Sequence, residues 1–229
     1  MIDHNLLHLL HLADPTLPIG GFAHSAGLET YVQKKIVCDH PSALSFIKSQ
    51  LSLNIQYTDA AFVSLAFDAT INNNWHLVSS LDRECTAVKL PREIREASQK
   101  LGIRLLKIFE PLCAGMMGTQ YLNAIKNKEL SGHYSIVFGM YGALLKLGKK
   151  NLLTGFYYNA AVGMVTNSVK LIPLSQQQGQ QLLYSLKTLI DDLSGYSMEP
   201  DPELIGLCCT GFDIRCMQHE QLYSRLYMS

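Results

Sequence analysis

Charged side chains are scarce in this chain of 229 residues. Only 17% of the residues are charged and 48% are hydrophobic, whereas an average soluble protein has roughly 25% charged residues. The 19 basic and 19 acidic residues cancel, which argues against nucleic acid as a partner. Because a chain near its isoelectric point is poorly protected against self-association, we expect a homo-oligomer or an obligate member of a complex.

Segments for membranes or export are also missing. No stretch approaches the roughly 18 uninterrupted apolar residues of a membrane span. The first residues, MIDHNLLHLLHL, lack the basic region and the cleavage site of a secretory signal. The 6 cysteines follow no regular spacing, so a disulfide framework is not expected in a chain of this length. We therefore predict a cytoplasmic protein with reduced thiols and no contact with membranes.

The common catalytic motifs are absent as well. There is no G-x-S-x-G, no phosphate-binding glycine loop followed by lysine, and no H-E-x-x-H. Gly20–Gly21 has neither a preceding strand nor a following lysine, and His219–Glu220 lacks a second histidine. The sequence therefore predicts neither an enzyme nor a bound cofactor.

The apolar residues follow a helical period almost throughout. Asp39 is placed to cap a helix that begins near Pro41. Further helices are predicted over 60–71, 75–88, 91–110, 117–126, 132–148, 152–171 and 176–193. Gly139 and Gly142 would allow close helix approach, and 152–171 should be the most buried element because it is apolar on all sides.

The pattern changes after Gly195, where prolines, glycines and isolated hydrophobic residues alternate. A terminal segment without its own core needs a partner to be held in place. We predict an all-α fold with one globular multi-helix domain, residues 1–210, and a C-terminal partner-docking tail, residues 211–229.

The segment from Asp14 to Tyr31 contains two prolines and several glycines among apolar residues. Such a loop is either a packed elbow between helices or an element that binds something. Ser25 and Glu29 are spaced i, i+4 and would share one face of a helix.

Two groups of residues contain potential metal ligands. His4, His8 and His11 would lie on one helix face, either as metal ligands or as a polar stripe. Cys208–Cys209 and Cys216-x-x-His219 provide soft ligand atoms, but buried or incidental thiols are the favoured explanation, because vicinal cysteines are awkward ligands for one tetrahedral ion. Neither group completes a site, so we predict no bound metal and keep these residues as weak candidates.

Two charged features are candidates for partner contacts. Arg92, Glu93, Arg95 and Glu96 crowd one helical turn, as either a solvated face or a docking patch. Lys170 ends an uncharged span, either as a buried cation at a helix C-terminus or as a charge presented to an acidic or phosphate-bearing partner.

Four segments, in order, carry a family pattern. The first matches DxxLPxGxFxxSxGLE through Asp14, Leu17, Pro18, Gly20, Phe22, Ser25, Gly27, Leu28 and Glu29. The second has Arg95, Ser98, Gly102 and Leu105, and the third has Lys170, Leu171, Pro173, Leu174, Gln176, Gly179 and Gln180. The fourth has Asp213, Met217, His219, Glu220, Tyr223, Arg225 and Leu226. Together they resemble the UreF family of urease accessory proteins, with Ser175 in place of a glycine and Tyr227–Met228–Ser229 in place of the usual Phe-Arg-Ser ending.

This resemblance implies an all-helical homodimer that joins a UreD-like (also called UreH-like) protein and the GTPase UreG. The assembly would deliver nickel to apo-urease, with this chain as a non-enzymatic adaptor. The alternatives are a factor that regulates the UreG GTPase, with Lys170 acting near phosphate charge, or a nickel-carrying metallochaperone. The partner-binding residues that we name are Glu29, Arg92, Arg95, Lys170, His219, Glu220, Tyr223 and Arg225.

Overall fold

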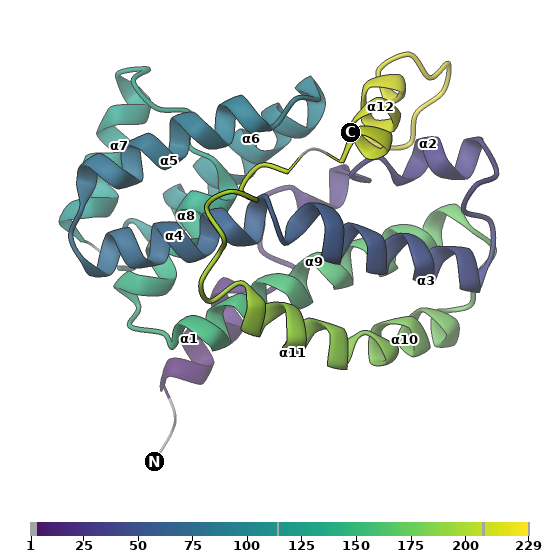
Figure 1. The fold of residues 1–229 in the computed structure, drawn as a ribbon, viewed down its shortest axis with the longest axis horizontal. Coiled ribbons are helices and arrows are strands. Elements are labelled where there is room, and N and C mark those ends of the chain that lie inside the picture. Colours follow the sequence, from purple (N-terminus) through teal and green to yellow (C-terminus); the bar gives the residue numbers. More distant parts are fainter. Residues whose placement is uncertain (1–3, 114, 208, 229) are drawn as a thin grey trace.

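The computed structural model describes residues 4–113, 115–207 and 209–228, and the regular structure in these ranges is helical throughout (Figure 1). The all-α prediction is therefore confirmed. In chain order the elements are α1 (His4–Leu12), η1 (Gly21–Ala23), α2 (Leu28–Gln33), α3 (His40–Ser49), the π-helical turn η2 (Gln50–Ile55), α4 (Asp59–Ile71), α5 (Trp75–Val88), α6 (Arg92–Phe109), α7 (Met116–Lys126), α8 (Tyr134–Leu144), α9 (Lys149–Leu171), α10 (Gln176–Ser185), α11 (Lys187–Tyr196) and α12 (Thr210–His219).

Local signals placed several helix ends correctly. Asp39 caps α3, and its side chain and that of Ser42 bond each other's backbone N–H in a reciprocal capping box. Helix α5 spans Trp75–Val88, as its apolar pattern predicts, and Asn74 accepts a hydrogen bond from the Leu77 amide at its start.

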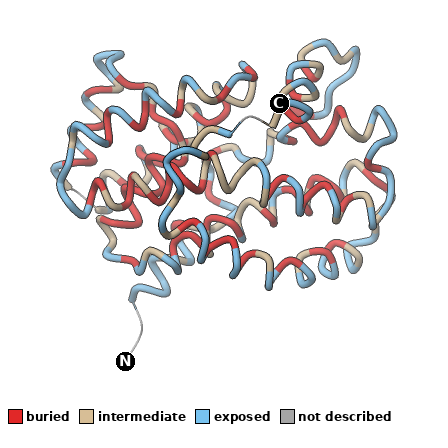
Figure 2. The backbone as a smooth tube through the Cα atoms, viewed as in Figure 1, coloured by how far each residue is buried: buried red, intermediate tan, exposed pale blue. Residues whose placement is uncertain are grey.

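Helix α8 forms the centre of the core, between α4 and α6. Nine of its 11 residues are buried, and the buried parts of the backbone concentrate around it and α4 in Figure 2. The two helices touch because α8 has glycine at the crossing, where a Cβ on Gly139 would clash with the Val63 carbonyl oxygen. The predicted close approach at Gly139 is thus confirmed.

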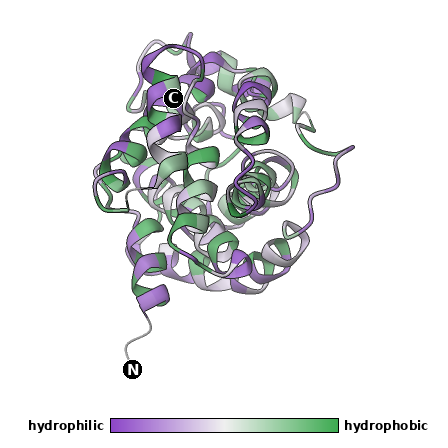
Figure 3. Ribbon diagram, turned by 90° about the vertical axis from the view of Figure 1, so that its left-hand side faces the viewer, coloured by the Kyte–Doolittle hydropathy of each residue, from purple (hydrophilic) through white to green (hydrophobic). Residues whose placement is uncertain are grey.

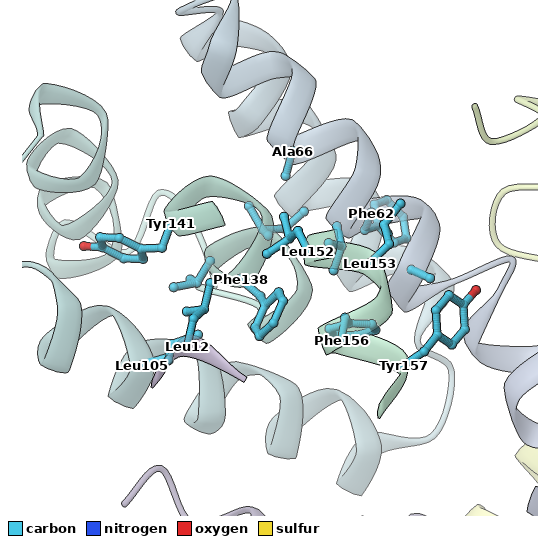
Figure 4. Packing of buried hydrophobic residues seen from close by; sticks show 14 of the residues in the cluster. Leu12, Phe62, Ala66, Leu105, Phe138, Tyr141, Leu152, Leu153, Phe156 and Tyr157 are labelled. Atoms are coloured by element: carbon cyan, nitrogen blue, oxygen red, sulfur yellow. The ribbon is translucent and has the colours of Figure 1, made fainter. Parts of the chain in front are cut away.

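Aromatic side chains join α8 to α9 (Figure 4). The rings of Phe138 and Phe156 meet edge to face with centroids 5.2 Å apart, a favourable geometry for aromatic pairs. Leu152 and Leu153, also on α9, are fully buried in the same cluster.

The prediction that 152–171 is the most buried element is wrong. Nine of the 23 residues of α9 are buried, against nine of 11 in α8. Helix α9 runs along the molecule with α10 and α11 beside it. Its remaining positions stay partly open, because those neighbours cover only part of its circumference.

The single long helix predicted over 176–193 is also wrong, since it breaks between α10 and α11. Leu186 at the break is fully buried, and its N–H bonds the Leu183 carbonyl, three residues back, at 3.3 Å. No proline or glycine marks this position. The break lets both short helices follow α9, so tertiary packing, and not local sequence, ends α10.

Helix α1 lies at the lower edge of the molecule in Figures 1 and 3 and carries both hydrophobic and hydrophilic residues. Its Leu6, Leu7 and Leu10 side chains are exposed, whereas Leu12 is buried. Among the described helices, none combines the length and apolar character needed to cross a bilayer. The exposed leucines form an apolar strip on the surface of α1.

Candidate protein-interaction site

The Asp14–Tyr31 segment is held as a fixed elbow on α6 and α9. Arg104 of α6 donates to the Ile19 carbonyl at 2.8 Å, and Asn167 of α9 donates to the His24 carbonyl at 2.9 Å. The Asp14 carboxylate accepts hydrogen bonds from both the amide and the hydroxyl of Thr16, and these bonds stabilise the turn at the start of the segment. These bonds place the beginning of α2 against the C-terminal part of the chain.

Gly27, the residue before α2, has a φ of 80°, a conformation that other residues adopt with difficulty. A Cβ at this position would lie 2.7 Å from the Cys216 sulfur on α12. Glycine is therefore needed twice, for the backbone turn and for the close approach of α12. The Cys216 thiol is buried there, and this burial raises its pKa.

Glu29 follows on α2 and faces the chain's own C-terminus instead of solvent. It is only 4% exposed, and its carboxylate accepts from the backbone amides of Leu226 at 2.8 Å and Tyr227 at 3.1 Å. The Ser25 hydroxyl accepts from the Glu29 amide at 3.4 Å. Both side chains are buried, so Ser25 and Glu29 orient the turn and do not form an outer face.

His219 at the end of α12 lies between two carboxylates. Its Nδ1 is 2.7 Å from Glu93 Oε2 on α6, and its Nε2 is 3.2 Å from Glu29 Oε2 on α2. Glu93 also accepts from the Arg225 guanidinium at 2.7 Å. Helix α12 therefore lies beside α2 and α6, as Figure 1 shows, and these charges join the three elements.

The residues after α12, 220–228, are called the C-terminal segment here. Besides the bonds to Glu29, Gln33 donates to the Ser224 carbonyl at 3.1 Å and the Met228 amide donates to the Ala23 carbonyl at 2.7 Å. Residues 211–228 are thus packed on their own domain. The docking role predicted for 211–229 can then involve only the side chains that point outward.

Three large apolar side chains of the C-terminal segment are exposed. Tyr223 is fully exposed, Leu226 is 68% exposed and Met228 is 60% exposed. We call these three the C-terminal apolar surface. Tyr227 between them is buried, and its hydroxyl has no hydrogen-bond partner among the described residues. Exposed apolar groups on an ordered backbone are typical of a surface that a partner covers.

The arginines of the charged turn have different surroundings. Arg92 pairs with Glu220 at 2.9 Å in an exposed ion pair, which contributes about 1 kcal/mol at most. Arg95 donates to the carbonyls of Lys89 at 2.8 Å and Leu90 at 3.1 Å, where it closes the end of α5. Arg92 is accessible to a partner, whereas Arg95 already has an internal role.

Lys170 lies in the last turn of α9 and is exposed. The interpretation of Lys170 as a buried cation is therefore wrong, although its place at a helix C-terminus is as expected. An exposed lysine at this end is available for a charged partner.

The metal-ligand candidates do not come together. His4, His8 and His11 are exposed on α1, with the His11 ring packed 5.1 Å from that of Phe109. Within residues 4–113, 115–207 and 209–228 there is no group of three or more histidine, cysteine or acidic residues able to hold a metal. Both ring nitrogens of His219 face carboxylates, and Cys208 lies outside the described residues.

A cavity of about 300 Å³, which no sequence pattern predicts, lies beside this site. Its lining comes from η1, η2, α4, α5, α6, α8, α9 and α12 and includes Phe22, Leu101, Tyr134, Phe156 and Phe212. Lys89 and Asp59 form an ion pair of 2.8 Å in its wall. Burial is the largest effect on the pKa of Lys89 and lowers it, but the charge and hydrogen bond of Asp59, with smaller effects of Cys85 and Asp213, together outweigh burial and raise the pKa.

No sequence signal points to this Lys89–Asp59 pair, which joins residues 30 positions apart. No sequence signal singles out Glu93 either, although it lies in the charged turn. Its partners His219 and Arg225 lie 126 and 132 positions away.

Comparison with known proteins gives consistent matches. The family model UreF matches residues 37–187. A protein of Haemophilus influenzae named "Urease accessory protein UreF" is 48% identical over 221 residues, which cover 96% of this chain and 94% of that protein. Proteins of the same name from Actinobacillus pleuropneumoniae serotype 5b and Lachnoclostridium phytofermentans are 49% and 32% identical, and they cover 96% and 100% of this chain and 97% and 100% of their own lengths.

Proposed function

Since this chain belongs to the UreF family of urease accessory proteins, we propose that it is a non-enzymatic adaptor in urease maturation. It would bridge a UreD/UreH-like protein and the GTPase UreG, so that nickel is inserted into apo-urease. The observation that carries this proposal is the C-terminal apolar surface, which is exposed on a backbone that buried Glu29 holds in place. The UreD/UreH-like partner would cover it.

The outward side chains allow a test that leaves the internal contacts of the segment intact. Tyr223→Ala combined with Leu226→Ala removes apolar surface, while the backbone bonds to Glu29 remain. We expect binding of the UreD/UreH-like protein to weaken at least tenfold in a pull-down or by calorimetry, because exposed aromatic anchors carry much of an interface's energy.

Tyr184→Ala is the matched control, since Tyr184 is also an exposed tyrosine, 72% exposed, but lies on α10. It should bind like the unchanged protein. Equal affinity of all three proteins would refute the docking role of the C-terminal apolar surface.

A second candidate function, regulation of the UreG GTPase, is favoured by the exposure of Lys170. A lysine presented to the nucleotide site would stabilise charge that develops on phosphate. Lys126 is the control, because it too is exposed in the last turn of a helix, α7. GTP turnover should change with Lys170→Ala and not with Lys126→Ala; unchanged turnover in both would exclude this function.

We also propose that the adaptor is a homodimer. The chain has a net charge of zero, and α1 leaves Leu6, Leu7 and Leu10 exposed. Light scattering should give about twice the 25.5 kDa of one chain. A mass of one chain at micromolar concentration would rule this out.

A further inference from the structure

The C-terminal segment is held by two carboxylates that also hold His219. Glu29 accepts the Leu226 and Tyr227 amides at 2.8 and 3.1 Å, and Glu93 accepts Arg225 at 2.7 Å. The same two carboxylates face the two ring nitrogens of His219. Any change at the ring therefore acts directly on the groups that hold the segment.

Whether both contacts of the ring are favourable depends on its protonation state. A neutral imidazole carries one N–H, so only one of its nitrogens can donate and the other presents a lone pair. Here both nitrogens lie within hydrogen-bond distance of carboxylate oxygens, at 2.7 and 3.2 Å. Both contacts are attractive only when the ring is protonated.

The charges give the same result. The side chains of His219, Glu29 and Glu93 are 1%, 6% and 13% exposed. Together with Arg225, a protonated His219 balances the two carboxylates. A neutral ring leaves one negative charge of this largely buried cluster without a cationic partner, which is destabilising.

We propose that His219 is a proton-dependent clasp that holds the C-terminal segment on α2 and α6 and releases it when the ring loses its proton. Release breaks the hydrogen bonds of Glu29 with the Leu226 and Tyr227 amides. The C-terminal apolar surface is then no longer fixed in position. The clasp goes beyond the adaptor role and is tested on the isolated chain, so its failure would not affect the proposed function.

Other ionisable groups near the cluster do not account for such a change. These groups are Glu29 on α2, Glu93 on α6, Arg225 and the exposed Arg92–Glu220 pair, and at longer range His24, Cys216 and Tyr227. Burial raises the pKa of the Cys216 thiol and of the Tyr227 phenol. Burial, with Lys100 and Arg104, lowers the pKa of His24. The Cys216 thiol and the Tyr227 phenol therefore stay uncharged at neutral and mildly alkaline pH, and His24 gains its proton only at a lower pH than an ordinary histidine.

Amide hydrogen exchange of the full chain tests the clasp. Exchange is measured by mass spectrometry at about pH 5.5 and pH 8.5, across the range where histidines usually change charge. Protection factors, which are corrected for the intrinsic pH dependence of exchange, are then compared. We expect the peptide containing Leu226 and Tyr227 to lose at least tenfold protection at the higher pH, while α8 keeps its protection. Equal protection at both pH values would overturn the proposal.

Variants separate the clasp from general effects of pH. Glu93→Gln removes one negative charge, so a neutral ring is then balanced and the pH dependence of the segment should disappear. His219→Gln should give low protection at both pH values, and far-ultraviolet circular dichroism checks that it folds. His76→Gln changes an exposed histidine on α5 and should behave like the unchanged protein. Persistence of the full pH dependence in both Glu93→Gln and His219→Gln would also refute the clasp.

Discussion

The carboxylate of Asp82 accepts hydrogen bonds from the Tyr121 hydroxyl and from the amides of Ser131, Gly132 and His133. Asp82 is fully buried, and these donors compensate for the cost of removing its charge from water. Tyr227 shows the opposite situation, because its buried hydroxyl has no hydrogen-bond partner in the part of the chain that the structure describes. At the scale of single residues, stability therefore depends on whether each buried polar atom is satisfied.

Tyr227→Phe should stabilise the protein by about 1 kcal/mol, since it removes a hydroxyl that is buried without a hydrogen bond. Urea unfolding followed by circular dichroism measures the change. Tyr121→Phe is the control: its hydroxyl bonds Asp82, so this variant should be less stable. A loss of stability in Tyr227→Phe would contradict the prediction.

His133 should make the protein less stable in mild acid. Burial, with the positive charges of Lys89 and Arg95, outweighs the Asp82 charge and lowers the pKa of His133 to about 4. In the unfolded chain a histidine has a pKa of about 6.5, so below that pH the unfolded state binds more protons and stability falls. The loss between pH 7 and pH 5 is about 2 kcal/mol. Urea unfolding at both pH values should show a smaller loss in His133→Gln, and an equal loss would contradict this cause.

At the scale of elements, the packing of α8 on α4 depends on glycine, which has no side chain, at position 139. Helix α8 approaches so closely that a Cβ on Gly139 would meet the Val63 carbonyl oxygen. The backbone of α4 cannot yield as a flexible side chain can. In contrast, Gly163 on α9 has open space around its Cβ position.

Gly139→Ala should therefore destabilise the protein by about 2–3 kcal/mol, because the helices must separate to make room. Gly163→Ala makes the same change inside a helix without a clash and should stabilise it by about 0.5–1 kcal/mol. Thermal unfolding of the two variants would give shifts of opposite sign. Shifts of the same sign would show that helix propensity, and not the α4–α8 contact, decides the outcome.

At the scale of the whole molecule, local sequence signals predicted the helices better than the contacts between them. The Asp39 cap and the bounds of α5 follow from neighbouring residues. The break at Leu186 follows from packing on α9, which no local pattern shows. The family pattern drew attention to Glu29 and His219, but not to their contact, because 190 positions separate them. Only the fold shows that the two side chains are in contact.

This contact changes what removal of residues 211–229 should do. Deletion would take away buried Phe212 and Cys216 and leave Glu29 without the partners that it has in the C-terminal segment. We expect the truncated chain to keep its helical circular dichroism but to lose about 3–5 kcal/mol of stability in urea unfolding. Loss of partner binding on deletion would then have two causes. The Tyr223→Ala, Leu226→Ala variant should lose binding without this loss of stability. If the truncated chain were as stable as the full one, residues 211–228 would not be part of the folded domain.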